Sequence, residues 1–246
     1  MLDFSKRASC SEIMDDLWSS GDDLNQALRE LDAINYVLGG NYVTLNGVMK
    51  LIGTRADSRL HIADLGCGSG DMLKRMRSLL EKRHVDAVLT GIDANPNVIS
   101  FAAAHTPTTC RINYESENIF SEGFRTRKFD IVTATLFFHH LTDEQLIGFL
   151  KQLKGQVSKG IVMNDIHRNW FSYYAIKWLT QLFSRSRMVK HDAPVSVLRA
   201  FRKRDIIDIL QRAGMLNYRI KWCWAFRGQV VVRFDEVLLP VDQLRT

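Results

Sequence analysis

One stretch, LHIADLGCGSGD from Leu60 to Asp71, constrains the fold of this chain more than any other part of the sequence. Its apolar run with an acid, Asp64, near the carboxyl end predicts a short buried strand. Three alternating glycines follow and predict a tight turn whose backbone can approach a ligand, because glycine carries no Cβ. A helix predicted at about 71–82 would point its free N–H groups at the same ligand. Strand, turn and helix in this order predict a nucleotide-type site.

The spacing of the glycines narrows the kind of nucleotide. It is G-x-G-x-G, whereas the dinucleotide fingerprint is G-x-G-x-x-G, and no P-loop lysine with Ser or Thr follows. A second acid, Asp93 in LTGIDANPNVI, ends an apolar run and is predicted at the tip of the next strand. A carboxylate there can accept hydrogen bonds from two ribose hydroxyls. The glycine loop alone is also compatible with an ordinary turn, but the strand, the helix and Asp93 together favour a cofactor site.

DLGCGSGD followed by GIDANP resembles class I S-adenosylmethionine-dependent methyltransferases, over roughly residues 60–234. The resemblance implies an α/β, Rossmann-like fold: a doubly wound, mostly parallel seven-stranded sheet with a C-terminal antiparallel hairpin and an N-terminal helical extension. It implies S-adenosyl-L-methionine as cofactor and S-adenosyl-L-homocysteine as product. The pattern is similar to that of quinone-biosynthesis and secondary-metabolite methyltransferases. These motifs are informative about the methyl donor and say little about the acceptor.

The resemblance also implies which residues bind the cofactor. In the family the glycine loop meets the methionine end, the second acid holds the ribose, and a side chain after the third strand binds the adenine amino group. Asn118 in SENIF occupies that last position, where the family commonly has Asp; Glu115 and a plain polar turn are alternatives. The residues expected to bind the cofactor are Asp64, Gly66, Cys67, Gly68, Gly70, Asp93, Ala94, Asn118, Ile119 and Thr135.

Composition bounds the remaining possibilities. The 246 residues, 46% of them hydrophobic, are enough for one well-buried domain with a small appendage. The net charge of +6 is modest and spread along the chain, so a nucleic-acid partner is not expected. The cysteines form no C-x-x-C pair and have no histidine at metal spacing, which predicts reduced thiols, no disulfides and no metal. With no apolar N-terminal core and no run of membrane-spanning length, we expect a cytoplasmic protein; a monomer and a homodimer both stay open.

Residues 1–58 are predicted to be a helical cover. Glu12 to Trp18 is a weak helix candidate, a second helix carries Leu24 and Leu28 on one face and ends at Gly39-Gly40, and Thr44 is the expected cap of a third. These helices either pack on the sheet or close the cofactor cleft, and the two roles are compatible.

Residues 59–246 are predicted to form the methyltransferase domain. Alternating patterns predict strands at 60–65, 87–93, 111–114, 129–135 and 160–165, with helices at 71–82, 96–104 and 142–154. An aromatic-rich helical insert is expected at about 167–195, as a helix over 170–183 followed by a polar, basic loop. A helix over 196–214 and a hairpin of strands 218–225 and 229–234 complete the chain.

Candidate catalytic residues follow the fourth and fifth strands, at the edge where ligands lie in an open α/β sheet. FDIVTATLFFHHL lacks the N-P-P-Y type motif of enzymes that methylate nucleic-acid amino groups, and it delivers His139 and His140. A histidine can take the proton of a hydroxyl as that oxygen attacks the methyl group. His140 is the first candidate, with His139 and Asp165 beside it. A structural turn for the histidine pair and a helix cap for Asp165 are the alternatives.

Candidate acceptor-binding residues come next in the chain. Arg168 can hold a carboxylate in a bidentate way, and aromatic residues cover most sides of the helix over 170–183, which predicts a second buried surface that binds an aromatic or lipidic acceptor. A dimer contact and a doubly covered helix explain the same pattern, and a plain connection explains the loop after it. The residues expected to contact the acceptor are His167, Arg168, Tyr173, Tyr174 and His191.

The sequence therefore predicts a methyltransferase for a small molecule, most simply at a hydroxyl oxygen by in-line displacement, in which proximity does most of the catalysis. Methylation of carbon, an RNA or protein acceptor, and a non-catalytic cofactor-binding protein are alternatives. A nicotinamide oxidoreductase is disfavoured by the glycine spacing.

Overall fold

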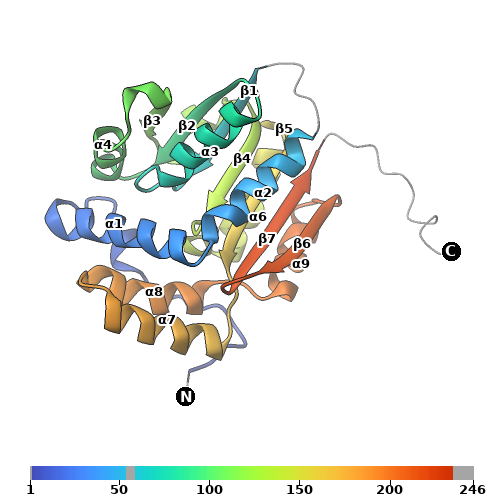
Figure 1. Ribbon diagram of the computed structural model, residues 1–246. Coiled ribbons are helices and arrows are strands. Elements are labelled where there is room, and N and C mark those ends of the chain that lie inside the picture. The colour runs from blue at the N-terminus through green and yellow to red at the C-terminus, as the bar shows by residue number, and fades with distance from the viewer. Residues whose placement is uncertain (1, 54–58, 235–246) are drawn as a thin grey trace.

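A single twisted sheet organises the protein in a computed structural model, which describes residues 2–53 and 59–234 (Figure 1). The strand order is β3-β2-β1-β4-β5-β7-β6, and all neighbours are parallel except β7, which runs antiparallel to β5 and β6. This confirms the expected fold class. The strands are β1 (Leu60–Leu65), β2 (Ala87–Asp93), β3 (Ile112–Ser116), β4 (Phe129–Thr135), β5 (Val157–Ile166), β6 (Tyr218–Cys223) and β7 (Arg227–Arg233).

Helices cover both faces of this sheet and one end of it. Those before β5 are α1 (Gly21–Val37), α2 (Gly40–Ile52), α3 (Asp71–Lys82), α4 (Pro96–Ala104), α5 (Glu122–Arg125) and α6 (Asp143–Lys154). Those after it are α7 (Trp170–Phe183), α8 (Arg187–Arg199) and α9 (Lys203–Arg212). Short 3-10 turns are η1 (Ile13–Asp15), η2 (Thr108–Cys110) and η3 (Phe138–His140). The predicted boundary between residues 58 and 59 lies at the edge of a segment outside the described ranges. The predicted domain end at residue 246 also lies outside them.

Strand alternation divides the core into two layers. Ile62 points to the face covered by α2 and α3, whereas Ala63 points to the face covered by α5, α6 and α9. Both layers are buried and apolar, as expected for a parallel sheet that is covered on both sides.

A third group of helices lies across the carboxyl ends of the strands. Figure 1 shows α7 and α8 side by side below α1, and Leu24, Val98 and Val189 from α1, α4 and α8 share one apolar cluster. This layer closes the end of the sheet where ligands of open α/β folds lie. Within the described residues, no helix is both long and apolar enough to span a bilayer.

Two predicted elements differ from the structure in the first part of the chain. Thr44 is no cap, because α2 already begins at Gly40. Its hydroxyl is buried inside the helix and instead lies 2.7 Å from that of Thr135 at the end of β4. The weak helix candidate at Glu12–Trp18 is only the short turn η1.

The prediction of a loop over 184–195 and a helix over 196–214 is wrong. The first part of that region is helix α8, capped by the Ser186 hydroxyl and tolerant of Pro194 in its interior. The helical pattern is then interrupted after Arg199, where Phe201 forms a parallel bridge with His167 and accepts a hydrogen bond from the Arg168 N–H at 3.0 Å. A tertiary backbone contact therefore decides where α8 ends and α9 begins.

Candidate active site

A cavity of about 640 Å³ lies between the carboxyl ends of the strands and the helices that cross them. This volume suits a cofactor together with a small acceptor. Its floor comes from the glycine loop after β1, the ends of β2 and β4, and η3, and its cover comes from η1, α1, α7 and α8. The N-terminal residues therefore line the same cavity as the glycine loop.

The glycine loop has the left-handed backbone that its sequence predicts. Gly66, Gly68 and Gly70 have φ angles of 62°, 53° and 74°, a region that favours glycine. A Cβ on Gly66 would collide with the Phe137 ring, and one on Gly70 with the Tyr114 hydroxyl, so both positions exclude larger residues sterically as well. Gly70 is the N-cap of α3, whose first N–H groups face the loop.

Two acids flank the loop, and one of them, Asp93, bonds to its backbone. Asp64 is buried and accepts a hydrogen bond from the Thr133 hydroxyl at 2.6 Å; burial raises its pKa to about 7 despite that bond. Asp93 accepts from the Asn95 N–H at 3.0 Å and from the Gly68 N–H at 3.4 Å, while burial raises its pKa as well. Both acids line the cavity.

The predicted adenine contact has a defined local geometry. The Asn118 side-chain oxygen accepts a hydrogen bond from the Phe120 N–H at 2.9 Å, which fixes the turn after β3. Asn118 and the buried Ile119 both line the cavity, whereas Glu115 does not belong to its lining and pairs with Arg127. Of the ten residues predicted to bind the cofactor, all except Gly70 line this one cavity.

Comparisons with known proteins identify this arrangement. A family model described as a methyltransferase domain matches residues 62–160. The solved plantazolicin methyltransferase BpumL, a complex with S-adenosylhomocysteine, is similar with a TM-score of 0.62 at 16% identity, over 87% of this chain and 95% of that one. Residues 62–160 therefore match a methyltransferase domain, and the described chain has the fold of a solved methyltransferase.

Two further similar proteins are methyltransferases by name. The ubiquinone biosynthesis O-methyltransferase of Coxiella burnetii is 23% identical over 195 residues, which are 78% of this chain and 74% of the relative. Human N-acetylserotonin methyltransferase in complex with S-adenosylmethionine has a TM-score of 0.61 at 17% identity, over 87% of this chain and 56% of the human one.

Beyond the glycine loop, the cavity has a wall of ionisable residues that includes His139 and His140. His139 is buried, and its Nδ1 lies 2.8 Å from Oδ1 of Asp165, with Nε2 at 3.4 Å from Oε1 of Glu12. Burial alone would lower its pKa, but the two carboxylates raise the pKa of His139 to about 9. Because a protonated imidazole has no lone pair to accept a proton, this geometry does not favour the predicted role of His139 as a base.

His140 lies beside His139 and is half-buried. Its Nδ1 is 2.6 Å from Oδ1 of Asp15, and the centroids of the two imidazole rings are 4.3 Å apart. Asp15 in turn accepts from Arg199 Nη1 at 2.5 Å, and these interactions hold the pKa of Asp15 well below its usual range although burial opposes them. His139 and His140 both line the cavity; Asp165 lies behind His139 and acts on it rather than facing the cavity.

Sequence reasoning missed several residues of this wall. Glu12 and Asp15 come from the N-terminal segment, Arg199 from the end of α8, and Arg227 from the start of β7. The only sequence signal was that Glu12 and Asp15 are three residues apart in a predicted helix. This spacing of acids is too common to indicate a site. Their partners are 59 to 192 residues away along the chain, so only the fold brings them together.

Arg227 is the most unusual of them. Its guanidinium is buried, Nη2 donates to Asn35 Oδ1 at 2.6 Å, and Nη1 has no hydrogen-bond partner among residues 2–53 and 59–234. Burial lowers the pKa of Arg227 to about 10, partly offset by Asp165, so the group is charged near neutral pH. Arg227 thus brings a positive charge to the cavity lining, and its Nη1 donor is not used by another described residue.

The structure places the five predicted acceptor residues outside the cavity lining. His167 stacks on Trp222 with ring centroids 4.1 Å apart, and the buried Arg168 pairs with Asp205 at 2.7 Å and with backbone carbonyls. Tyr173 packs edge-on against Phe4, Tyr174 is 45% exposed, and His191 pairs with Asp192 at the surface. These side chains serve packing and ion pairing in the structure, which differs from our expectation.

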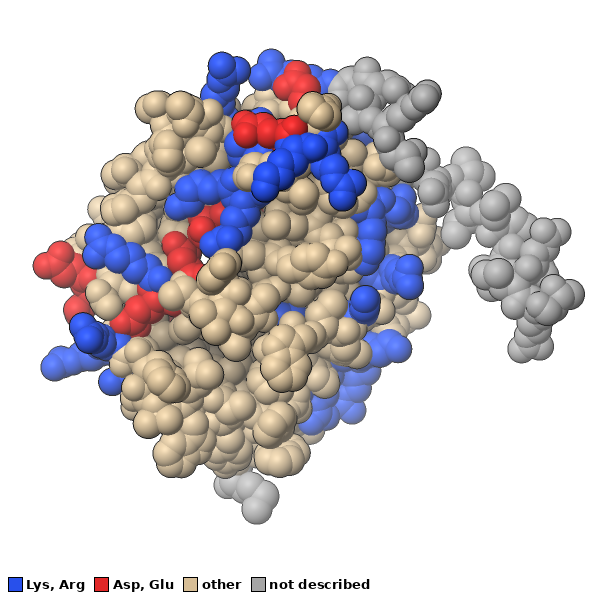
Figure 2. Space-filling model, viewed as in Figure 1, with Lys and Arg blue, Asp and Glu red and all other residues tan. Residues whose placement is uncertain are grey.

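Helix α7 likewise turns only a narrow face to the cavity, with Ile176, Leu179 and Thr180. Its large apolar side chains instead lie at the surface, and Figure 2 shows few charged side chains over this lower part of the molecule. The exposed residues are Trp170, Phe171, Tyr174, Trp178, Leu182 and Phe183.

Proposed function

We propose that this methyltransferase transfers the methyl group of S-adenosylmethionine to a hydroxyl oxygen of a small aromatic or lipidic acceptor. The observation that carries the proposal is that one cavity contains both the glycine loop and the histidine wall, formed by His139 and His140. An acceptor that lies against His139 and His140 is therefore in the same enclosed space as the methyl donor, and proximity and exclusion of water supply most of the catalysis.

The chemistry of the acceptor side supports this choice. Transfer to a hydroxyl releases a proton, and His140, whose Nδ1 lies 2.6 Å from Asp15, lines the cavity where an imidazole could take that proton. Apolar side chains such as Leu28, Leu31 and Leu179 line other parts of the cavity and suit an aromatic or aliphatic body. The O-methyltransferase name of the Coxiella burnetii relative agrees with this proposal.

The Nη1 atom of Arg227, unpaired within the described residues, adds a second requirement. A guanidinium with a spare donor in a buried cavity favours acceptors that carry a carboxylate or a phenolate near the reacting hydroxyl. Hydroxybenzoates and catechol carboxylates are the simplest molecules with both features.

The test is turnover of methyl-labelled S-adenosylmethionine with phenols, catechols and hydroxybenzoates, followed by mass spectrometry of the products. We expect a methoxy product from at least one hydroxybenzoate. A methyl group found on ring carbon would replace the proposal by C-methylation, and binding of S-adenosylhomocysteine without turnover of any acceptor class would favour a non-catalytic cofactor-binding protein.

A further inference from the structure

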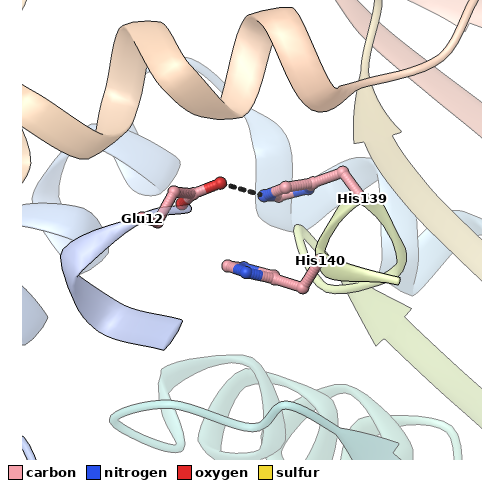
Figure 3. A group of neighbouring side chains, drawn as sticks. All are labelled: Glu12, His139 and His140. Atoms are coloured by element: carbon pink, nitrogen blue, oxygen red, sulfur yellow. Dashed lines mark ion pairs between the residues drawn. The ribbon is translucent and has the colours of Figure 1, made fainter. Parts of the chain in front are cut away.

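Glu12, His139 and His140 form a cluster of metal-binding side chains on the cavity wall. Their potential ligand atoms all lie within 4.8 Å of one another. Figure 3 shows the two imidazole rings one above the other, with the Glu12 carboxylate facing His139. We propose that these three residues bind a divalent transition-metal ion that holds the oxygen of the methyl acceptor.

Both histidines are oriented as metal ligands usually are. A ligating histidine typically gives its second ring nitrogen to a carboxylate, which fixes the ring and its tautomer. Here Nδ1 of His139 lies 2.8 Å from Asp165 and Nδ1 of His140 lies 2.6 Å from Asp15. Two separate carboxylates thus fix two neighbouring rings through the same ring atom, leaving both Nε2 atoms for a ligand.

Two of the ligand atoms are buried without a hydrogen bond. Glu12 Oε1 and His139 Nε2 are inaccessible to solvent and have no hydrogen-bond partner within the described residues; they are 3.4 Å apart as an ion pair. Buried polar atoms are nearly always satisfied, so such a pair at a cavity wall indicates a missing partner. A metal ion with bonds of about 2.0–2.2 Å to nitrogen and oxygen would satisfy both.

The charges around the cluster agree with a divalent cation. Three carboxylates, from Glu12, Asp15 and Asp165, meet two guanidinium groups, from Arg199 and Arg227. A bound metal ion would displace the ring proton of His139. With both histidines then neutral, the group has one excess negative charge, which a divalent ion together with one oxyanion of the acceptor would neutralise. Arg199 lies 3.5 Å from Glu12 but donates primarily to Asp15, which leaves Glu12 available.

Two histidines and one carboxylate suit Zn²⁺, Mn²⁺ or Fe²⁺ and leave further coordination positions open. Because the cluster lines the cavity, those positions face the space proposed for the acceptor. In this respect the inference rests on the proposed function. The sequence predicted no metal, since Glu12 and the histidine pair are far apart in the chain and have no recognisable ligand spacing.

The test uses the untagged full chain, stripped with a chelator, dialysed against Zn²⁺ or Mn²⁺ and measured by elemental analysis and calorimetry. We expect one ion per chain, and weaker binding by about 100-fold in Glu12→Gln and His140→Gln. Asp165→Asn, which changes only the carboxylate behind His139, should weaken binding by about 10–100-fold. His84→Asn is the matched control, because His84 is exposed, outside the cavity lining and in a left-handed conformation that Asn tolerates.

Calorimetry with S-adenosylhomocysteine separates this inference from the proposed function. Each variant should bind S-adenosylhomocysteine as the parent does, which also shows that it is folded. Absence of metal from the parent chain, or equal metal affinity in the Glu12→Gln, His140→Gln and His84→Asn chains, would overturn the inference. Failure of the parent to bind S-adenosylhomocysteine would instead contradict the cofactor assignment and leave the metal measurement intact.

Discussion

Oδ1 of Asp32 accepts a hydrogen bond from the Ser69 hydroxyl at 2.5 Å, and this contact joins α1 to the glycine loop. Burial raises the pKa of Asp32 to about 6, above its ordinary value of 3.8, although Ser69 opposes the shift. The helix that covers the cavity is therefore tied to the cofactor loop by a carboxylate that is costly to ionise.

This shift predicts a pH dependence of stability. The folded state binds the Asp32 proton more tightly than the unfolded state, so the contribution of this group to stability is most favourable below pH 3.8. It is progressively lost as pH rises through 6. Asp32→Asn should remove that loss and raise the free energy of unfolding by about 1 kcal/mol at pH 7.5, after allowance for partial solvent screening. Urea unfolding of both chains at pH 5 and 7.5 checks this, and an equal difference at the two pH values would refute it.

Asp93→Ala should weaken binding of S-adenosylhomocysteine by about 10–100-fold, because it removes charge-assisted hydrogen bonds to the ribose. Calorimetry measures the affinity. The control is Asp86→Ala, since Asp86 is exposed just before the same strand and makes only a long ion pair with Arg59. If Asp93→Ala binds like the control, Asp93 serves only the loop backbone.

Arg227→Gln should discriminate between classes of acceptor. The loss of a cavity guanidinium should raise the KM for a hydroxybenzoate by about 10-fold or more and change that for the matching neutral phenol little. The ratio of the two kcat/KM values is independent of the fraction of folded protein. Arg219→Gln, on the exposed part of β6, is the control, and an unchanged ratio would exclude Arg227 from acceptor binding.

Arg168→Met should lower stability while leaving KM unchanged in the protein that remains folded. Arg168 is 1% exposed and pairs with Asp205, and removal of one partner of a buried pair typically costs about 3–5 kcal/mol. Chemical unfolding and kinetics on the same preparation separate the two effects. The double variant Arg168→Met, Asp205→Asn should recover part of the stability, whereas a selective rise in KM would return Arg168 to the acceptor site.

The two halves of the cavity differ in how well their residues could be predicted from the sequence. The cofactor half is local: Asp64 and the glycines follow one strand, Asp93 ends the next, and parallel strands bring their carboxyl ends to one edge. Nine predicted cofactor residues therefore line the cavity. The acceptor half depends on tertiary contacts, and the predicted residues Arg168 and Tyr174 lie elsewhere because the helical pattern does not reveal which face of α7 is covered.

The sequence by itself determined the sheet and the glycine loop with its two acids, since short-range patterns of apolar residues, glycines and strand-end acids specify them. Only the tertiary structure decided the histidine wall. Glu12 reaches His139 across more than half of the chain, and Asp165 and Asp15 fix the two rings through contacts that no sequence spacing predicts. The physical reason is that a buried polar group needs partners in space, wherever in the chain the fold finds them.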